Sequence, residues 1–295
     1  MKRTAAAALG LASLVALHAG TARAYCRTST CSSCPRDAAT GCTIGGLPIA
    51  WPNACVSFSM HEAASASIDL ARASALMGEA FAVWENARCG PDGAKPSISI
   101  SDAFGPALCG TPQFNTRTGN ANVVMFRDDH WPYSGVGREL AATSLTVDGQ
   151  GAILDADIEI NATGPLAVPE GLALGVIVDQ HDLYSIMVHE AGHFLGLDHS
   201  RADSSVMQAE LSAAEVRSQL SPDDEAAICA AYPPERDAVA CDAAPQRGFA
   251  AECAPAAARG GCSVGRRGGS SGALASAAVL WGLWSMRSAR RRRTE

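Results

Sequence analysis

The chain has 295 residues, of which 47% are hydrophobic and 18% are charged, and its formal net charge is −7 at pH 7. This length and apolar content are enough for a sizeable core in one or two domains. The negative balance argues against nucleic acid as a partner, and the body of the chain is more acidic still because many arginines lie in the two terminal segments.

The N-terminus has the pattern of a secretory signal peptide. Lys2 and Arg3 precede an apolar run over 5–17, and small residues follow, so we expect residues 1–24 to be removed before Tyr25. The apolar run is too short to span a bilayer comfortably. The sequence therefore predicts an exported protein.

The eleven cysteines all follow the expected signal, which fits disulfides formed in an oxidising compartment. Ten of them can pair and one is left over. Connectivity cannot be deduced from sequence, although Cys89 with Cys109 and Cys241 with Cys253 would each close a plausible local loop.

Residues 25–43 form a Cys-rich arm that lacks apolar periodicity, so we expect an extended segment pinned by disulfides. Cys31 and Cys34 form a CxxC without a second pair at zinc-finger spacing. Disulfides are therefore favoured over a cysteine-bound zinc.

The residues that follow alternate between strand and helix patterns. A stripe of apolar residues at intervals of four predicts a helix over 68–86, with Trp84 in the core. Period-two alternation predicts strands on either side of this helix, at 55–60, 97–101, 122–126, 142–147 and 153–161.

The stretch over 189–200 has the pattern of a zinc site. His189 and His193 are four residues apart, so a helix places both imidazoles on one face. Glu190 lies beside them, where a carboxylate can act as a general base without binding the metal. Gly196 can end the helix, and the turn that follows would place His199 beside the first two histidines. Three nitrogen ligands leave one tetrahedral position open, which is typical of a catalytic zinc.

These residues resemble the zinc-binding motif of the metzincin metalloproteases, and Ser200 after the third histidine resembles the matrixin branch. Met207, eight residues beyond His199, stands where matrixins have the methionine of the Met-turn. The helix expected over 220–231 is similar to the matrixin C-terminal helix, whose paired aspartates support that turn. The likeness covers about 44–232.

The resemblance implies an α+β fold, with a twisted, mostly parallel five-stranded sheet and about three helices. One antiparallel edge strand would border the cleft, so that 122–126 or the strand after it would lie near the substrate. The implied activity is hydrolysis of peptide bonds by metal-activated water, with Glu190 as general base and Zn²⁺ on the three histidines. Extended polypeptides, above all extracellular proteins, would bind antiparallel to the edge strand.

The sequence matches the family's other metal sites less completely than it matches the zinc-binding motif. The region before the zinc helix offers only His130 for a second, structural zinc, so that site is not expected. Calcium, which the family often binds, would need oxygen ligands. Two interpretations stay open for the acidic side chains near the strands, calcium ligands or solvated acids, and these side chains are Asp128, Asp129, Asp155, Asp157 and Glu159.

The C-terminal part is different in composition. Residues 234–261 read as a linker, and residues 262–295 resemble a myxobacterial sorting tail, with Cys262, an apolar helix over 273–286 and an arginine cluster over 290–293. Cys262 would be the site of processing and lipid attachment, or else one more disulfide cysteine. The membrane would be a partner only through this tail.

The sequence thus predicts a signal (1–24), an arm (25–43), a matrixin-like domain (44–233), a linker (234–261) and a tail (262–295). We expect an exported, surface-sorted zinc endopeptidase. The alternatives are a catalytically idle zinc-containing adhesion module and a zinc hydrolase that does not act on proteins. The intact Glu190 argues against the idle module, because a structural site needs no base.

Overall fold

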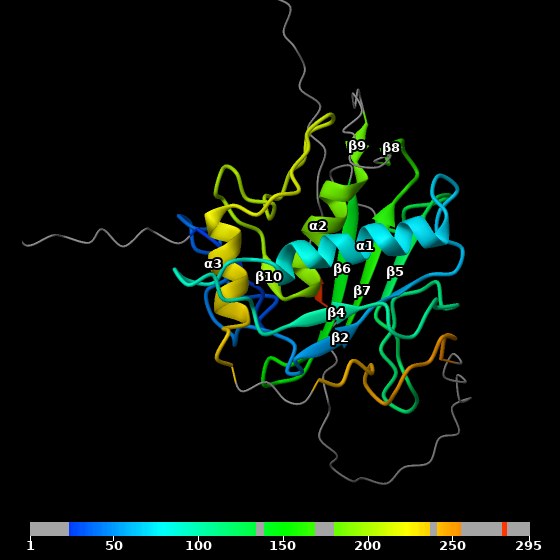
Figure 1. The fold of residues 1–295 in the computed structure, drawn as a ribbon, viewed down its shortest axis with the longest axis horizontal. Helices are drawn as coiled ribbons and strands as arrows, with labels where there is room; N and C mark the ends of the chain where they lie inside the picture. Colours follow the sequence, from blue (N-terminus) through cyan, green and yellow to red (C-terminus); the bar gives the residue numbers. More distant parts are fainter. Residues whose placement is uncertain (1–23, 134–138, 169–179, 237–240, 255–278, 282–295) are drawn as a thin grey trace, which may run out of the picture.

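The structure, a computed structural model, describes residues 24–133, 139–168, 180–236, 241–254 and 279–281. Its centre is a five-stranded sheet in the order β11-β6-β7-β5-β3. Figure 1 shows β6, β7 and β5 of this sheet side by side. Three of the strands are mutually parallel, β6 runs antiparallel to its neighbour β7, and β11 runs antiparallel to β6. The strands are β3 (Ser59–Met60), β5 (Val123–Arg127), β6 (Ala141–Val147), β7 (Ile153–Asn161) and β11 (Val279–Trp281).

Three further strand pairs lie outside this sheet. One is parallel and joins β2 (Cys55–Ser57) to β4 (Ser99–Ser101). Another is also parallel and joins β8 (Leu166–Ala167) to β9 (His181–Asp182). The third is antiparallel and pairs β1 (Cys26–Arg27) with β10 (Leu197–Asp198).

Three helices complete the described fold, namely α1 (Leu70–Glu85), α2 (Leu183–Phe194) and α3 (Pro222–Ala231). Each begins after a side chain that accepts a hydrogen bond from its first turn, the role being taken by Asp69, Asp182 and Ser221. Helices α1 and α2 lie across the sheet, and α3 stands to one side (Figure 1). The apolar stripe of α1 and nearly all of α2 are buried in the main core.

The two faces of β7 differ in character. Ala156, Ile158 and Ile160 belong to the main core. The alternate residues are acidic, and Asp155 and Glu159 are nevertheless buried. A smaller apolar cluster that includes Val123 on β5 lies apart from the main core.

The expected α+β class, multi-stranded sheet and three helices are confirmed. The strands and helices predicted within the domain agree with the observed ones to within about two residues, except that the strand expected over 55–60 divides at Phe58. The short strands β1, β8, β9 and β10 were not predicted. Trp84 is buried, as expected. His181, which lies just before the helix with two of the histidines, belongs to β9 and is only 6% exposed.

Disulfides join distant segments of the chain. The two suggested local pairs were wrong, because both Cys89 and Cys109 pair far along the sequence, and spacing carries no information about tertiary proximity. Cys34, in the expected arm, is bonded to Cys31, so neither sulfur is available for a cysteine-bound zinc. The five bonds are Cys26–Cys42, Cys31–Cys34, Cys55–Cys241, Cys89–Cys229 and Cys109–Cys253.

The terminal segments are described only in part. Within the expected linker, residues 241–254 lie against the domain, where Phe249 stacks on Phe104. The expected signal up to residue 23 and most of the tail, with Cys262, lie outside the described residues. Three residues of the apolar helix expected in the tail instead form strand β11. In the described part of the chain, no helix has the length and apolar character needed to cross a membrane.

Candidate metal centre

Helix α2 and the turn after it bring the three predicted histidines together. The Nε2 atoms of His193 and His199 are 3.2 Å apart, and the ring centroids of His189 and His193 are 4.7 Å apart. Each of the three residues offers one ligand atom, and these atoms lie within 4.8 Å of one another. Among the described residues this is the one group of three or more side chains that could hold a metal ion.

Backbone carbonyls orient two of these rings. His189 Nδ1 lies 2.7 Å from the carbonyl of Val206, and His193 Nδ1 lies 2.9 Å from that of Leu197. A carbonyl can only accept, so Nδ1 must carry the proton in both rings. The Nε2 atom of each neutral ring is then left with a lone pair for a metal.

The electrostatic setting also favours neutral ligands. Burial lowers the pKa of His193, and it lowers the pKa values of His189 and His199 well below the usual range. Neighbouring imidazoles act in the same direction on His189 and His199. Neutral imidazole is the form that binds a metal.

The spacing of the histidines fits a tetrahedral ion. Zinc–nitrogen bonds of about 2.0–2.1 Å at tetrahedral angles place ligand nitrogens roughly 3.3 Å apart. The 3.2 Å between His193 and His199 agrees with that value. Three histidines are the donor set of several catalytic zinc sites.

Glu190 follows the first histidine on α2 and is completely buried. Thr143 on β6 donates a hydrogen bond of 2.6 Å to its Oε2 atom, whereas no described residue donates one to Oε1. Burial raises the pKa of Glu190 to about 8, and the Thr143 hydrogen bond opposes that rise. Since a nearby cation favours an ionised carboxylate, a metal on the histidines would lower this pKa.

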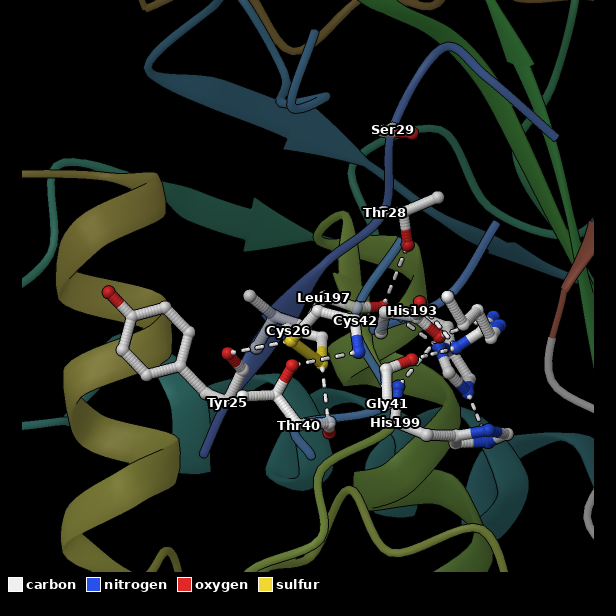
Figure 2. Close-up of polar contacts among 12 residues, drawn as sticks. Tyr25, Cys26, Thr28, Ser29, Thr40, Gly41, Cys42, His193, Leu197 and His199 are labelled. Atoms are coloured by element: carbon white, nitrogen blue, oxygen red, sulfur yellow. Dashed lines mark hydrogen bonds and ion pairs between the residues drawn. A yellow bond between two sulfur atoms is a disulfide. The ribbon is translucent and has the colours of Figure 1, made fainter. Parts of the chain in front are cut away.

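The turn that returns His199 depends on glycine and on the N-terminal arm. Gly196 has a φ of +84°, and a Cβ there would lie 2.8 Å from the carbonyl oxygen of Ile49. The arm pairs with the turn through β1 and β10, and the backbone N–H of Thr28 donates to the carbonyl of Gly196. The hydroxyl of Thr28 donates to the carbonyl of Leu197 (Figure 2). Between the ligands, Asp198 accepts from the backbone N–H of His199 and forms an ion pair of 3.2 Å with Arg36.

Met207 lies against α2 on the side of Gly192. Its turn is held from α3, where Asp224 accepts a hydrogen bond from the backbone N–H of Val206 at 3.0 Å and another from the hydroxyl of Ser205. The neighbouring Asp223 accepts from Ser200 at 2.7 Å. The paired aspartates expected from the matrixin resemblance thus contact both the Met-turn and the ligand turn.

The structure does not bring the five acidic residues considered for calcium into one group. Asp128 accepts hydrogen bonds from Ser65 and Ala66, and Glu159 pairs with Arg127. Asp155 and Asp157 are hydrogen-bonded to each other, and burial raises both pKa values. These contacts favour structural roles for the acids, and calcium stays a prediction.

Some parts of this centre were not visible in the sequence. Nothing marked Thr143 as the partner of Glu190, since they are 47 residues apart. The ion pair of Arg36 with Asp198 joins residues 162 apart. The alternation over 142–147 predicted the strand that contains Thr143, but it gave no information about which residue Thr143 contacts.

Comparison with known proteins agrees with this geometry. Residues 114–233 match the family model described as Matrixin. The chain is also 33% identical over 117 residues to the "Probable matrix metalloproteinase 095L" of Invertebrate iridescent virus 3. That similarity spans 37% of this chain but only 29% of the relative's length. The matched residues include the three histidines, Glu190 and Met207, so the chain contains a matrixin-like domain whose histidine triad can hold a metal ion.

Proposed function

We propose that the chain is a zinc-dependent endopeptidase. The observation that carries this proposal is Glu190, a buried carboxylate on the same helix as two of the three clustered histidines. Burying a carboxylate away from water costs free energy. A site that binds metal only for stability would gain nothing from such a residue. The Matrixin match and the similarity to a probable matrix metalloproteinase support the same class of activity.

The residues of the chain divide the chemistry between them. When bound by His189, His193 and His199, zinc supplies a Lewis acid for the attacking water and for the scissile carbonyl. Glu190 takes the proton of that water at Oε1 and passes it to the leaving amine. Thr143 holds Oε2 and so keeps the carboxylate in one orientation. No covalent bond between the enzyme and the peptide is needed.

We further propose the setting in which this activity operates. The substrates are extended polypeptides, most naturally extracellular proteins, and the protein acts after export, at the cell surface or outside the cell. Five disulfides among the described residues support an oxidising compartment. Sorting and lipid attachment through Cys262 belong to the same proposal.

The deciding experiment compares Glu190→Ala with a matched control from the same chain. Glu62 also follows a histidine, His61, but it is exposed and lies outside the cluster, so Glu62→Ala controls for the substitution itself. Loss of a general base lowers the rate by roughly 10²- to 10⁴-fold. We expect casein hydrolysis to fall by this factor in Glu190→Ala and to stay unchanged in Glu62→Ala. The zinc content of both variants should equal that of the unmodified protein.

The two other classes predict different results. An idle adhesion module would bind zinc and leave casein intact in the unmodified protein as well. A hydrolase of small molecules would cleave esters or amides and spare casein. Either result would reject the endopeptidase.

A further inference from the structure

The outer edge of β6 is occupied by a segment from the far end of the chain. Strand β11 pairs antiparallel with β6, with Val279 opposite Leu145, Leu280 opposite Ser144 and Trp281 opposite Thr143. Strand β6 lies between β11 and β7, so β11 takes the edge that would otherwise present unpaired N–H and C=O groups.

This edge adjoins the candidate catalytic residues. Thr143, the residue opposite Trp281, is the one whose hydroxyl donates to Glu190. Neighbouring strands lie about 4.8 Å apart. The backbone of β11 therefore runs one strand spacing from the strand that orients the proposed general base.

An extended peptide that adds to a sheet uses the backbone groups of the edge strand. The proposed substrates would need the same groups of β6 that β11 now uses, and two strands cannot pair with one edge at once. We infer that β11 is an intramolecular competitor of the substrate and restrains the activity of the site. This inference rests on the proposed endopeptidase function.

The pairing is suited to a reversible restraint. It spans three residues, and β6 is the single neighbour of β11 among the described strands, so few backbone hydrogen bonds hold β11 in place. Because β11 belongs to the same chain, its pairing with β6 is intramolecular and is favoured over the pairing of a separate peptide of the same sequence. If β11 occupied the edge in about nine molecules of ten, the apparent affinity for substrate would fall about tenfold.

Proline substitutions in the full chain test this competition. Alternate residues of a strand direct their N–H groups to the same neighbour, so one of Leu280→Pro and Trp281→Pro must remove a hydrogen bond to β6. Leu280→Val keeps the N–H and a residue type that favours strands, and it serves as the matched control.

Two readouts are measured on the zinc-loaded full chain and these variants. The first is binding of a fluorescent peptide with the sequence of residues 276–284, followed by anisotropy. The second is hydrolysis of an unfolded protein, with KM and kcat determined separately. We expect at least one proline variant to bind the peptide about tenfold more tightly, and to show a KM about tenfold lower at similar kcat, while the valine control stays unchanged.

The two readouts separate this inference from the proposed function. Equal peptide binding by the full chain and both proline variants would overturn the competition, whether or not hydrolysis occurs. Tighter peptide binding without any hydrolysis would support occupancy of the edge and reject the endopeptidase instead.

Discussion

At Gly192 the close packing of α2 excludes any side chain. A Cβ at this position would overlap the Sδ atom of Met207 and lie 2.8 Å from Cζ2 of Trp84. The indole cannot move away freely, because its Nε1 donates a hydrogen bond of 2.8 Å to the carbonyl of Val188. Glycine here lets the Met-turn and α1 approach the helix that carries two histidines.

Gly192→Ala should therefore destabilise the protein despite its better helix propensity. Alanine in place of glycine favours a helix by about 1 kcal/mol, whereas overpacking a core costs about 1–3 kcal/mol. We expect a net loss of up to about 2 kcal/mol in the free energy of unfolding, measured by urea denaturation. Gly78→Ala in α1 is the matched control, since nothing lies within 4 Å of its Cβ, and it should stabilise. Stabilisation by both substitutions would contradict the packing argument.

At the scale of elements, β7 carries a pair of buried acids on the face away from the main core. Asp157 accepts hydrogen bonds from the backbone N–H groups of Gln113 and Val123. Burial, and then the charge of Asp157, raises the pKa of Asp155 well above its usual range. Asp155 therefore holds a proton that it donates to Asp157.

This pair predicts a pH dependence of stability with a definite sign. An acid whose pKa is raised by folding binds more protons in the folded state, so its contribution is complete below the unfolded value near 3.9 and declines as the pH rises through the folded value. Asp155→Asn keeps a donor for Asp157 and removes this titration. The slope of the free energy of unfolding against pH should become less negative by up to about 1.4 kcal/mol per unit.

The measurement is urea denaturation between pH 5 and pH 9. The exposed Asp92→Asn is the control and should leave the slope unchanged. Added calcium tests the other interpretation, because a cation held by Asp155 and Asp157 would stabilise the unmodified protein as the pH rises. A slope in Asp155→Asn equal to that of the unmodified chain would contradict the shared proton.

Local periodicity was sufficient to predict the three helices, the main strands and the placement of two of the clustered histidines on one helix face. The four-residue spacing of His189 and His193 and the alternation around Ile158 are properties of a single element. Two other features could not be predicted in this way, namely the pairing of β1 with β10 and the hydrogen bond from Thr143 to Glu190. Each joins residues that only the tertiary fold brings together. The same reason explains why both suggested local disulfides were wrong.

At the scale of the whole molecule, disulfides divide into two classes. Cys89–Cys229 joins residues 140 apart and connects the segment after α1 to α3. Two more long-range bonds, at sequence separations of 186 and 144, attach the segment 241–254 to the domain. In the arm, Cys31–Cys34 spans only three residues. A cross-link restricts the unfolded chain more when the loop it closes is longer.

Removal of Cys89–Cys229 should therefore cost more stability than removal of Cys31–Cys34. The other long bonds shorten the effective loop, so the chain-entropy relation predicts a loss of about 4 kcal/mol for Cys89→Ala/Cys229→Ala, against about 1–2 kcal/mol for Cys31→Ala/Cys34→Ala. Urea denaturation of the zinc-loaded variants measures both losses, and neither pair includes a residue of the histidine cluster. Chain entropy requires the disulfide that closes the longer loop to contribute more stability. Equal losses would therefore mean that Cys31–Cys34 stabilises the protein through local packing as well.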